Sequence, residues 1–143
     1  GKLGLPANAL VAFALGADIV NVAREAMLAI GCIQAQKCHT DRCPTGVATQ
    51  DRWLAHGLDP AQKSHRLASY VKTLRRDLVK LAGAAGVPHP ALIGPDDVAL
   101  LDGDRRERSL RDVYGYRESW GLPGRAIADE LVRLMTEDAT GGD

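Results

Sequence analysis

The stretch GCIQAQKCHTDRCPTG, residues 31–46, holds all three cysteines of the chain: Cys32, Cys38 and Cys43. Few of its residues favour a helix, and Pro44 and Gly46 interrupt regular structure, so the sequence predicts a loop over residues 31–51. An odd, clustered set of thiols makes a poor disulfide framework. The clustering indicates metal or cluster binding in a reducing compartment.

The spacing of the thiols narrows the choice of metal site. Zinc ribbons use close cysteine pairs, and none is present. His39 would complete a three-cysteine, one-histidine set, but it directly follows Cys38, and adjacent ligands strain a tetrahedral site. Three thiolates suit an iron–sulfur cluster that lacks one protein ligand, with Lys37, His39 and Arg42 placing positive charge near the sulfurs. The chemistry alone leaves a bound cluster or metal and unrelated free thiols open in equal measure, and buried cysteines that only fill space are a third, less favoured interpretation.

Upstream of the loop, the pattern is helix, strand, helix, as in an α/β protein. Residues 5–15 are predicted to form a helix that starts near Pro6 and ends before Gly16. The β-branched run over residues 18–22 predicts a strand, and residues 23–30 begin a second helix. The turn at Ala23 and Arg24 suits phosphate binding by backbone N–H groups. Without a glycine-rich fingerprint, an ordinary strand-to-helix turn is the more favoured interpretation.

Downstream of the loop, the sequence predicts a mostly helical arrangement. Asp59 as N-cap and Pro60 at the first helical position begin a long amphipathic helix, which Gly86 and Pro88 end. Residues 95–101 are predicted to form one or two further helical turns, and residues 104–119 a charged surface segment or partly ordered arm. A last helix is expected from Arg125 to Met135, followed by a frayed end over residues 140–143.

Composition excludes several classes of protein. Lys plus Arg and Asp plus Glu each number 18, so charge gives no indication of nucleic-acid binding. No apolar run approaches the ~20 residues of a membrane span, and Gly1–Leu15 lack the pattern of a signal peptide. We expect a bacterial cytoplasmic location, with a membrane anchor in an upstream segment as the open alternative. The chain opens on glycine and not on methionine, which processing or an incomplete reading frame would explain, and we expect a fragment of a longer protein.

Taken together, these segments resemble the glutamate synthase family. The resemblance rests on GKLG at 1–4, GAD at 16–18, AR at 23–24, LAIGC at 28–32, KCH at 37–39 and CPTGVATQ at 43–50. NVAREAM at 21–27 more narrowly resembles the shorter FMN-binding members, which lack a glutamine amidotransferase domain. The resemblance is specific across the cysteine loop, extends to about Ile93 and fades after Asp102.

The resemblance implies a fold and two cofactors. The fold is α/β, the C-terminal portion of a (β/α)₈ FMN barrel with its last helix–strand–helix unit, followed by the cysteine loop and a mostly helical tail. The family's [3Fe–4S] ligands fall on Cys32, Cys38 and Cys43. Its FMN phosphate site falls on two turns, Gly1-Lys2 and Ala23-Arg24, where backbone N–H groups are expected to matter more than side chains. His39 and Thr49 are expected to support the ligands, and no acid, base or nucleophile is assigned.

The implied reaction is the reductive amination of 2-oxoglutarate with ammonia or glutamine-derived nitrogen, yielding glutamate. Electrons would come from ferredoxin or an NAD(P)H-linked subunit, and the protein is a candidate homo-oligomer. We expect three regions: the barrel end with the cysteine loop at 1–52, a helical extension at 53–103 and a tail at 104–143. The first six strands lie outside this chain, so we expect it to be inactive alone. Open alternatives are another amine or keto acid on the same scaffold, a non-catalytic metal or iron–sulfur module, and a truncated remnant.

Overall fold

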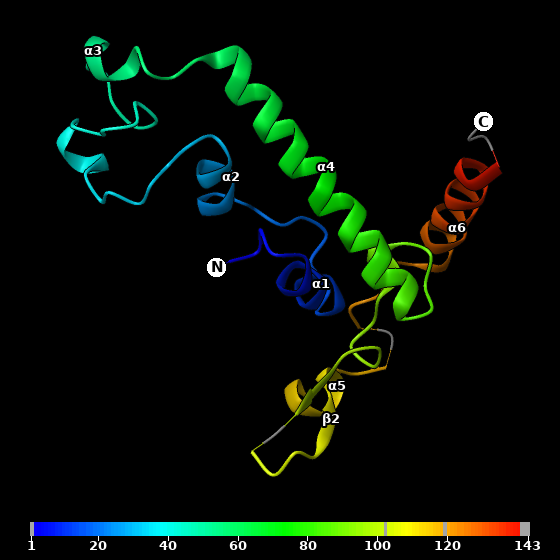
Figure 1. Ribbon diagram of the computed structural model, residues 1–143. Helices are drawn as coiled ribbons and strands as arrows, with labels where there is room; N and C mark the ends of the chain where they lie inside the picture. Colours follow the sequence, from blue (N-terminus) through cyan, green and yellow to red (C-terminus); the bar gives the residue numbers. More distant parts are fainter. Residues whose placement is uncertain (1, 102, 119, 141–143) are drawn as a thin grey trace. The chain divides into compact units, whose positions relative to one another are not determined.

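The computed structural model describes residues 2–101, 103–118 and 120–140 and is largely helical (Figure 1). Its α-helices are α1 (Pro6–Ala14), α2 (Arg24–Ala29), α3 (Arg52–Ala55), α4 (Pro60–Ala84), α5 (Leu110–Tyr114) and α6 (Arg125–Thr140). Two 3₁₀ turns are η1 (Cys38–Thr40) and η2 (Pro90–Leu92), and two strands are β1 (Ala99–Leu101) and β2 (Glu107–Ser109). No described helix combines the length and apolarity that crossing a membrane requires.

The chain divides into two compact units whose boundary falls inside α4. The first unit contains the residues up to Leu5 together with Asn21–Arg75, and so holds α2, the cysteine loop and α3. The second contains Pro6–Val20 together with the residues from Arg76 onward, and so holds α1, the small sheet, α5 and α6. Both cofactor sites predicted from the sequence lie in the first unit.

The predicted helices upstream and downstream of the loop are confirmed. The Asp59 carboxylate accepts the backbone N–H groups of Ala61 at 3.0 Å and Gln62 at 3.4 Å, which makes it the N-cap of α4. The helix ends just before Gly86, whose positive φ of 85° suits a residue without a side chain. α6 begins at Arg125 as predicted but continues to Thr140, beyond the expected end at Met135. The rest of the predicted frayed end, residues 141–143, lies outside the described residues.

The predicted strand over residues 18–22 is wrong for this structure. The segment between α1 and α2 is irregular, and Ile19 is 82% exposed. A strand forms only when neighbouring strands bond its backbone groups. The only sheet among the described residues pairs β1 with β2, which offers residues 18–22 no partner. The helix–linker–helix segment is compatible with part of an α/β fold, and the barrel itself stays a prediction.

One prediction for the region after α4 is also wrong, and another is only partly met. Residues 95–101 form a turn and strand β1 instead of helical turns. The segment predicted as a surface segment or partly ordered arm is mostly exposed in its described residues, 104–118, but it contains strand β2 and α5. β1 pairs antiparallel with β2, with Ala99 opposite Ser109 and Leu101 opposite Glu107. Ser109 then caps α5 by accepting the backbone N–H of Asp112 at 3.1 Å.

The core of the second unit explains why this region is ordered. It is built from fully buried residues far apart in sequence: Ala14, Ala82, Ile93 and Leu110. Leu110, at the start of α5, completes a core whose other members come from α1, α4 and the segment after η2. Charged residues dominate the sequence of residues 104–119. One buried leucine among them produces no apolar periodicity, so the sequence pattern did not predict α5.

Candidate functional site

The cysteine loop has an unusual backbone conformation. Gln34, Gln36 and Asp41 all have left-handed φ values, between 56° and 59°. Such values are uncommon for residues with a side chain and mark a chain that turns sharply. Gly46, with φ of 74°, packs so closely on α3 that an added Cβ would lie 2.6 Å from the Leu54 carbonyl oxygen. The backbone therefore winds tightly through the segment that carries the three thiols.

One carboxylate ties the middle of the loop to its end. Asp41, which lies between Cys38 and Cys43, accepts the backbone N–H of Gln50 at 2.6 Å and the Thr49 hydroxyl at 2.9 Å. The Thr49 hydroxyl also lies 2.6 Å from the Asp41 carbonyl oxygen. The Gln50 N–H and then the Thr49 hydroxyl lower the pKa of the Asp41 carboxyl, so it stays charged at neutral pH. Thr49, predicted to support the ligands, therefore acts through the loop backbone.

The three cysteines have different surroundings. Cys43 is buried, and its Sγ lies 3.4 Å from the Thr45 hydroxyl oxygen. That hydroxyl and the backbone N–H groups of Thr45, Ala48 and Val47 lower the pKa of the Cys43 thiol to about 7, against the opposing effect of burial. Cys32 is partly buried and accepts the Gln34 backbone N–H at 3.3 Å. Cys38 is exposed at the start of η1.

The donor set fits a thiolate-ligated cluster in its chemistry. The Cys32 sulfur accepts a hydrogen bond and the Cys43 sulfur shares one with the Thr45 hydroxyl, and hydrogen bonds to sulfur are the contacts that tune thiolates and clusters. In the described part of the chain, however, no three His, Cys, Asp or Glu side chains are grouped closely enough to hold a metal ion. The cysteines are thus on one short loop but not gathered, and their assignment as ligands stays a prediction.

The two turns predicted to hold the FMN phosphate are connected within the first unit. Gly4 lies against α2: an added Cβ there would be 2.6 Å from Glu25 Cβ and 2.5 Å from the Tyr70 hydroxyl oxygen. That hydroxyl donates to the Gly4 carbonyl at 2.8 Å. Lys2 has φ of 64° in a turn closed by the Leu5 N–H to its carbonyl at 3.3 Å. The structure therefore brings the Lys2 turn beside the start of α2, while Gly1 lies outside the described residues.

The start of α2 leaves its first backbone donors available. Ala23 has no side-chain oxygen to cap the helix, and both Ala23 and Arg24 are exposed. Uncapped N–H groups at a helix start are the groups that bind phosphate. Behind them, burial and then the charge of Glu25 raise the pKa of Tyr70, which keeps its hydroxyl a donor to Gly4. The uncapped start of α2 is compatible with phosphate binding by backbone N–H groups, and that role stays a prediction.

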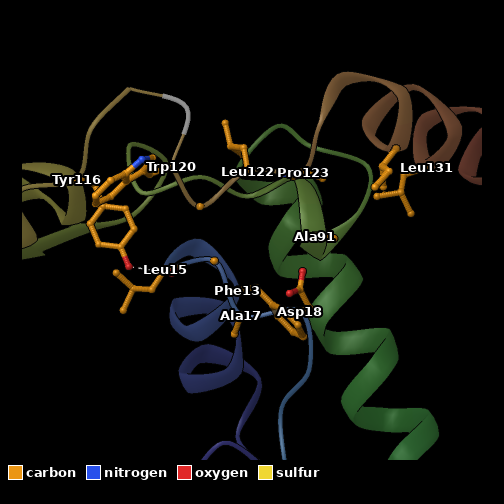
Figure 2. Close-up of a pocket in the computed structure, with 13 residues that line it drawn as sticks. Phe13, Leu15, Ala17, Asp18, Ala91, Tyr116, Trp120, Leu122, Pro123 and Leu131 are labelled. Atoms are coloured by element: carbon orange, nitrogen blue, oxygen red, sulfur yellow. Dashed lines mark hydrogen bonds between the residues drawn. The ribbon is translucent and has the colours of Figure 1, made fainter.

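The second unit has a pocket of its own, of about 610 Å³ (Figure 2). Tyr116 donates its hydroxyl to the Leu15 carbonyl at 2.8 Å, and its ring meets Trp120 edge to face with centroids 6.1 Å apart. Leu131 of α6 and Asp18 also line the pocket. It contains none of the residues predicted to bind FMN or the cluster.

Comparison with known proteins decides the family. Residues 1–88 match the conserved region in glutamate synthase. The chain belongs to the glutamate synthase family. This family member is 51% identical over 104 residues to the glutamate synthase large subunit-like protein YerD of Bacillus subtilis, a match covering 73% of the chain and 20% of that protein.

Other relatives extend the comparison. The chain is 37% identical over 87 residues to the archaeal glutamate synthase (NADPH) of Archaeoglobus fulgidus, covering 61% of the chain and 17% of that protein. It is 32% identical to a glutamate synthase large subunit-like protein of Rhizobium meliloti, covering 71% of the chain and 26% of that protein. The chain thus spans about a fifth of the length of the curated relatives it matches. No solved structure gives a significant match.

Several residues that shape the sites of this family member were missed by sequence reasoning. Asp41, Thr45 and Tyr70 organise the cysteine loop or the Lys2 turn through hydrogen bonds. Asp41 and Tyr70 had no motif to mark them, because their partners lie nine and 66 residues away. Thr45 lies within the CPTG run that carries the resemblance, and that run was the one available signal.

Proposed function

We propose that this chain is the cofactor-holding C-terminal part of an FMN and iron–sulfur oxidoreductase of glutamate synthase type. One observation carries the proposal: within the family-matched region, a tightly wound loop presents three thiols, two of which are already in hydrogen bonds. A loop built only for packing would have no need of hydrogen bonds to its sulfurs. In this proposal the other barrel strands come from the part of a full-length polypeptide that corresponds to the remaining four-fifths of the relatives' length.

Each predicted residue has a stated task in this proposal. Cys32, Cys38 and Cys43 hold a [3Fe–4S] cluster, and the Lys2 and Ala23-Arg24 turns hold the FMN phosphate through backbone N–H groups. When bound, the cofactors supply the electron and hydride transfer. The chain's own residues orient the sulfurs, through Asp41 and Thr49, and hold the Lys2 turn against α2, through Gly4 and Tyr70.

The reaction we propose is the reductive amination of 2-oxoglutarate to glutamate, with ammonia or glutamine-derived nitrogen. The archaeal relatives carry NADPH in their names, which supports electrons from an NAD(P)H-linked subunit, with ferredoxin as the other candidate donor. The same scaffold acting on another amine or keto acid is the alternative, and the relatives named only as large subunit-like leave it open.

The first test is the cofactor content of the full-length polypeptide that carries this sequence, purified without air. We expect flavin together with about three irons per chain, measured with labile sulfide and the ultraviolet–visible spectrum. That result would justify assays with 2-oxoglutarate and ammonia. Zinc, or neither metal nor flavin, would contradict the proposal and favour a binding module or remnant.

The second test addresses the ligands directly. Cys38 is exposed, so Cys38→Ser should not disturb packing, and loss of iron and sulfide with most of the FMN kept would report lost ligation. His39→Gln is the matched control, since it changes the neighbouring residue and should retain the cluster. Iron at wild-type level in Cys38→Ser would show that the assignment is wrong, and metal loss in His39→Gln would indicate a three-cysteine, one-histidine zinc site instead.

A further inference from the structure

A lysine of α4 lies directly against the start of the cysteine loop. Lys63 is half-buried in the first turn of the helix, where its backbone N–H donates to the Asp59 carbonyl at 3.0 Å. Its Nζ lies only 3.2 Å from the place a Cβ would occupy on Gly31, the residue before Cys32. Gly31 also has φ of 113°, a conformation that favours glycine. The absence of a side chain at Gly31 is what allows the ammonium to approach the loop.

The surroundings of this ammonium are positive. A cavity of about 490 Å³ is lined there by Lys63, Arg66, Cys32, Pro44 and Thr45, together with apolar and glycine residues, and its lining has no carboxylate. The ion pairs found among the described residues involve Arg76, Arg111 and Arg133, and none includes Lys63. The Lys63 ammonium therefore borders this cavity with no carboxylate among the residues that line it. Its position is explained if an anionic group shares the site.

We propose that Lys63 is a positioning residue for the iron–sulfur site, supplying a fixed positive charge that compensates the thiolates and raises the cluster's reduction potential. This rests on the proposed function, because the cluster is part of it. Three thiolates on one loop repel one another, and a nearby cation offsets that repulsion. Net charge around a cluster is one of the quantities that set its potential, and an added electron is favoured by a neighbouring positive charge.

The test compares Lys63→Met with two partner variants in the full-length polypeptide. Lys63→Met removes the charge and keeps a side chain of similar length, whereas Lys63→Arg keeps the charge. Lys72→Met makes the same change on the same helix, at an exposed position ~13 Å further along at ~1.5 Å per residue. The readouts are iron and sulfide content and the cluster's midpoint potential, followed by electron paramagnetic resonance during a redox titration.

We expect Lys63→Met to make reduction of the cluster about tenfold less favourable, about 59 mV for one electron. Lys63→Arg and Lys72→Met should stay near the wild-type potential. Cluster loss from Lys63→Met, with iron retained in Lys63→Arg and Lys72→Met, would also support the charge role. Lys63→Arg keeps the charge at this position, and Lys72→Met removes only a distant charge. An unchanged potential with full iron would overturn the inference and leave the proposed function standing. Cluster loss from both Lys63 variants would assign Lys63 to packing, and a wild-type protein without iron would overturn both proposals.

Discussion

At the scale of single residues, Gly4 has no room for an added methyl group unless its neighbours shift. Its φ is not left-handed, so the conflict is one of space: a Cβ would lie 2.5 Å from the Tyr70 hydroxyl and 2.6 Å from Glu25 Cβ. We expect Gly4→Ala to push the Lys2 turn away from α2 and to lower the flavin retained by the full-length polypeptide several-fold. The measurement is FMN per chain after gel filtration, with the iron content unchanged.

Gly83→Ala is the matched control for this variant. Gly83 lies in α4, where nothing approaches within 4 Å of an added Cβ, and alanine favours a helix over glycine by about 1 kcal/mol. It should therefore keep its flavin. Wild-type flavin in Gly4→Ala would mean that the Lys2 turn does not take part in the phosphate site.

The same scale shows which contacts a sequence can reveal. The Asp59 cap of α4 was predictable because the cap and the groups it accepts are two and three residues apart. The Tyr70 bond to Gly4 spans 66 residues, and the approach of Lys63 to Gly31 depends on how α4 packs. Local hydrogen bonds follow from residue type and spacing, whereas these two follow only from tertiary structure.

At the scale of elements, the hairpin and α5 depend on one buried side chain. Leu110 is fully buried in the core of the second unit. Replacing a buried leucine by alanine costs roughly 2–5 kcal/mol, through lost burial and the cavity left behind. We expect Leu110→Ala to lower the protection of backbone amides over residues 107–117, measured by hydrogen exchange and mass spectrometry.

Leu101→Ala provides the control for this prediction, because Leu101 lies in the same hairpin and is 73% exposed. It should leave the exchange of these amides nearly unchanged. Equal effects of the two variants would mean that α5 does not depend on the Leu110 core.

Residues 18–22 show what happens to a segment that lacks such a tertiary partner. Their β-branched composition predicted a strand, and without neighbouring strands the segment stays irregular.

At the scale of the whole molecule, the sequence was most informative where the family's pattern is densest. The helices before and after the cysteine loop and the family itself were predicted from the region of residues 1–88. The hairpin, α5 and the Figure 2 pocket, formed largely by later residues, were not predicted. Short elements held by one core residue and by ion pairs carry little periodicity, so their order becomes visible only when the chain is folded.

Acid should weaken the second unit, because an ion pair links three of its segments. Arg111 binds both oxygens of Asp96, at 2.6 to 2.8 Å, and donates to the carbonyls of Tyr116 and Arg117. Arg111 lowers the pKa of the Asp96 carboxyl below its ordinary value of 3.8. Above that value both the folded and unfolded states are ionised, and the stabilisation is complete. As the pH falls through 3.8 and then through the folded pKa, the unfolded state takes up its proton first and the stabilisation is lost.

The prediction is that amide protection over residues 95–98 and 110–117 falls as the pH drops from 6 to about 3, after correction for intrinsic exchange. Asp96→Asn should be less protected at pH 6 and should lose less on acidification, because asparagine has no proton to gain. Glu107→Gln removes an exposed acid that forms no ion pair among the described residues, and it should follow the wild-type curve. Parallel curves for wild type and Asp96→Asn would show that the Asp96–Arg111 pair does not carry the acid sensitivity. The charge linking the turn at Asp96 to α5 would then be dispensable, because the buried Leu110 side chain and the backbone bonds from Leu110 to Val98 and from Arg111 to Pro95 hold these segments together.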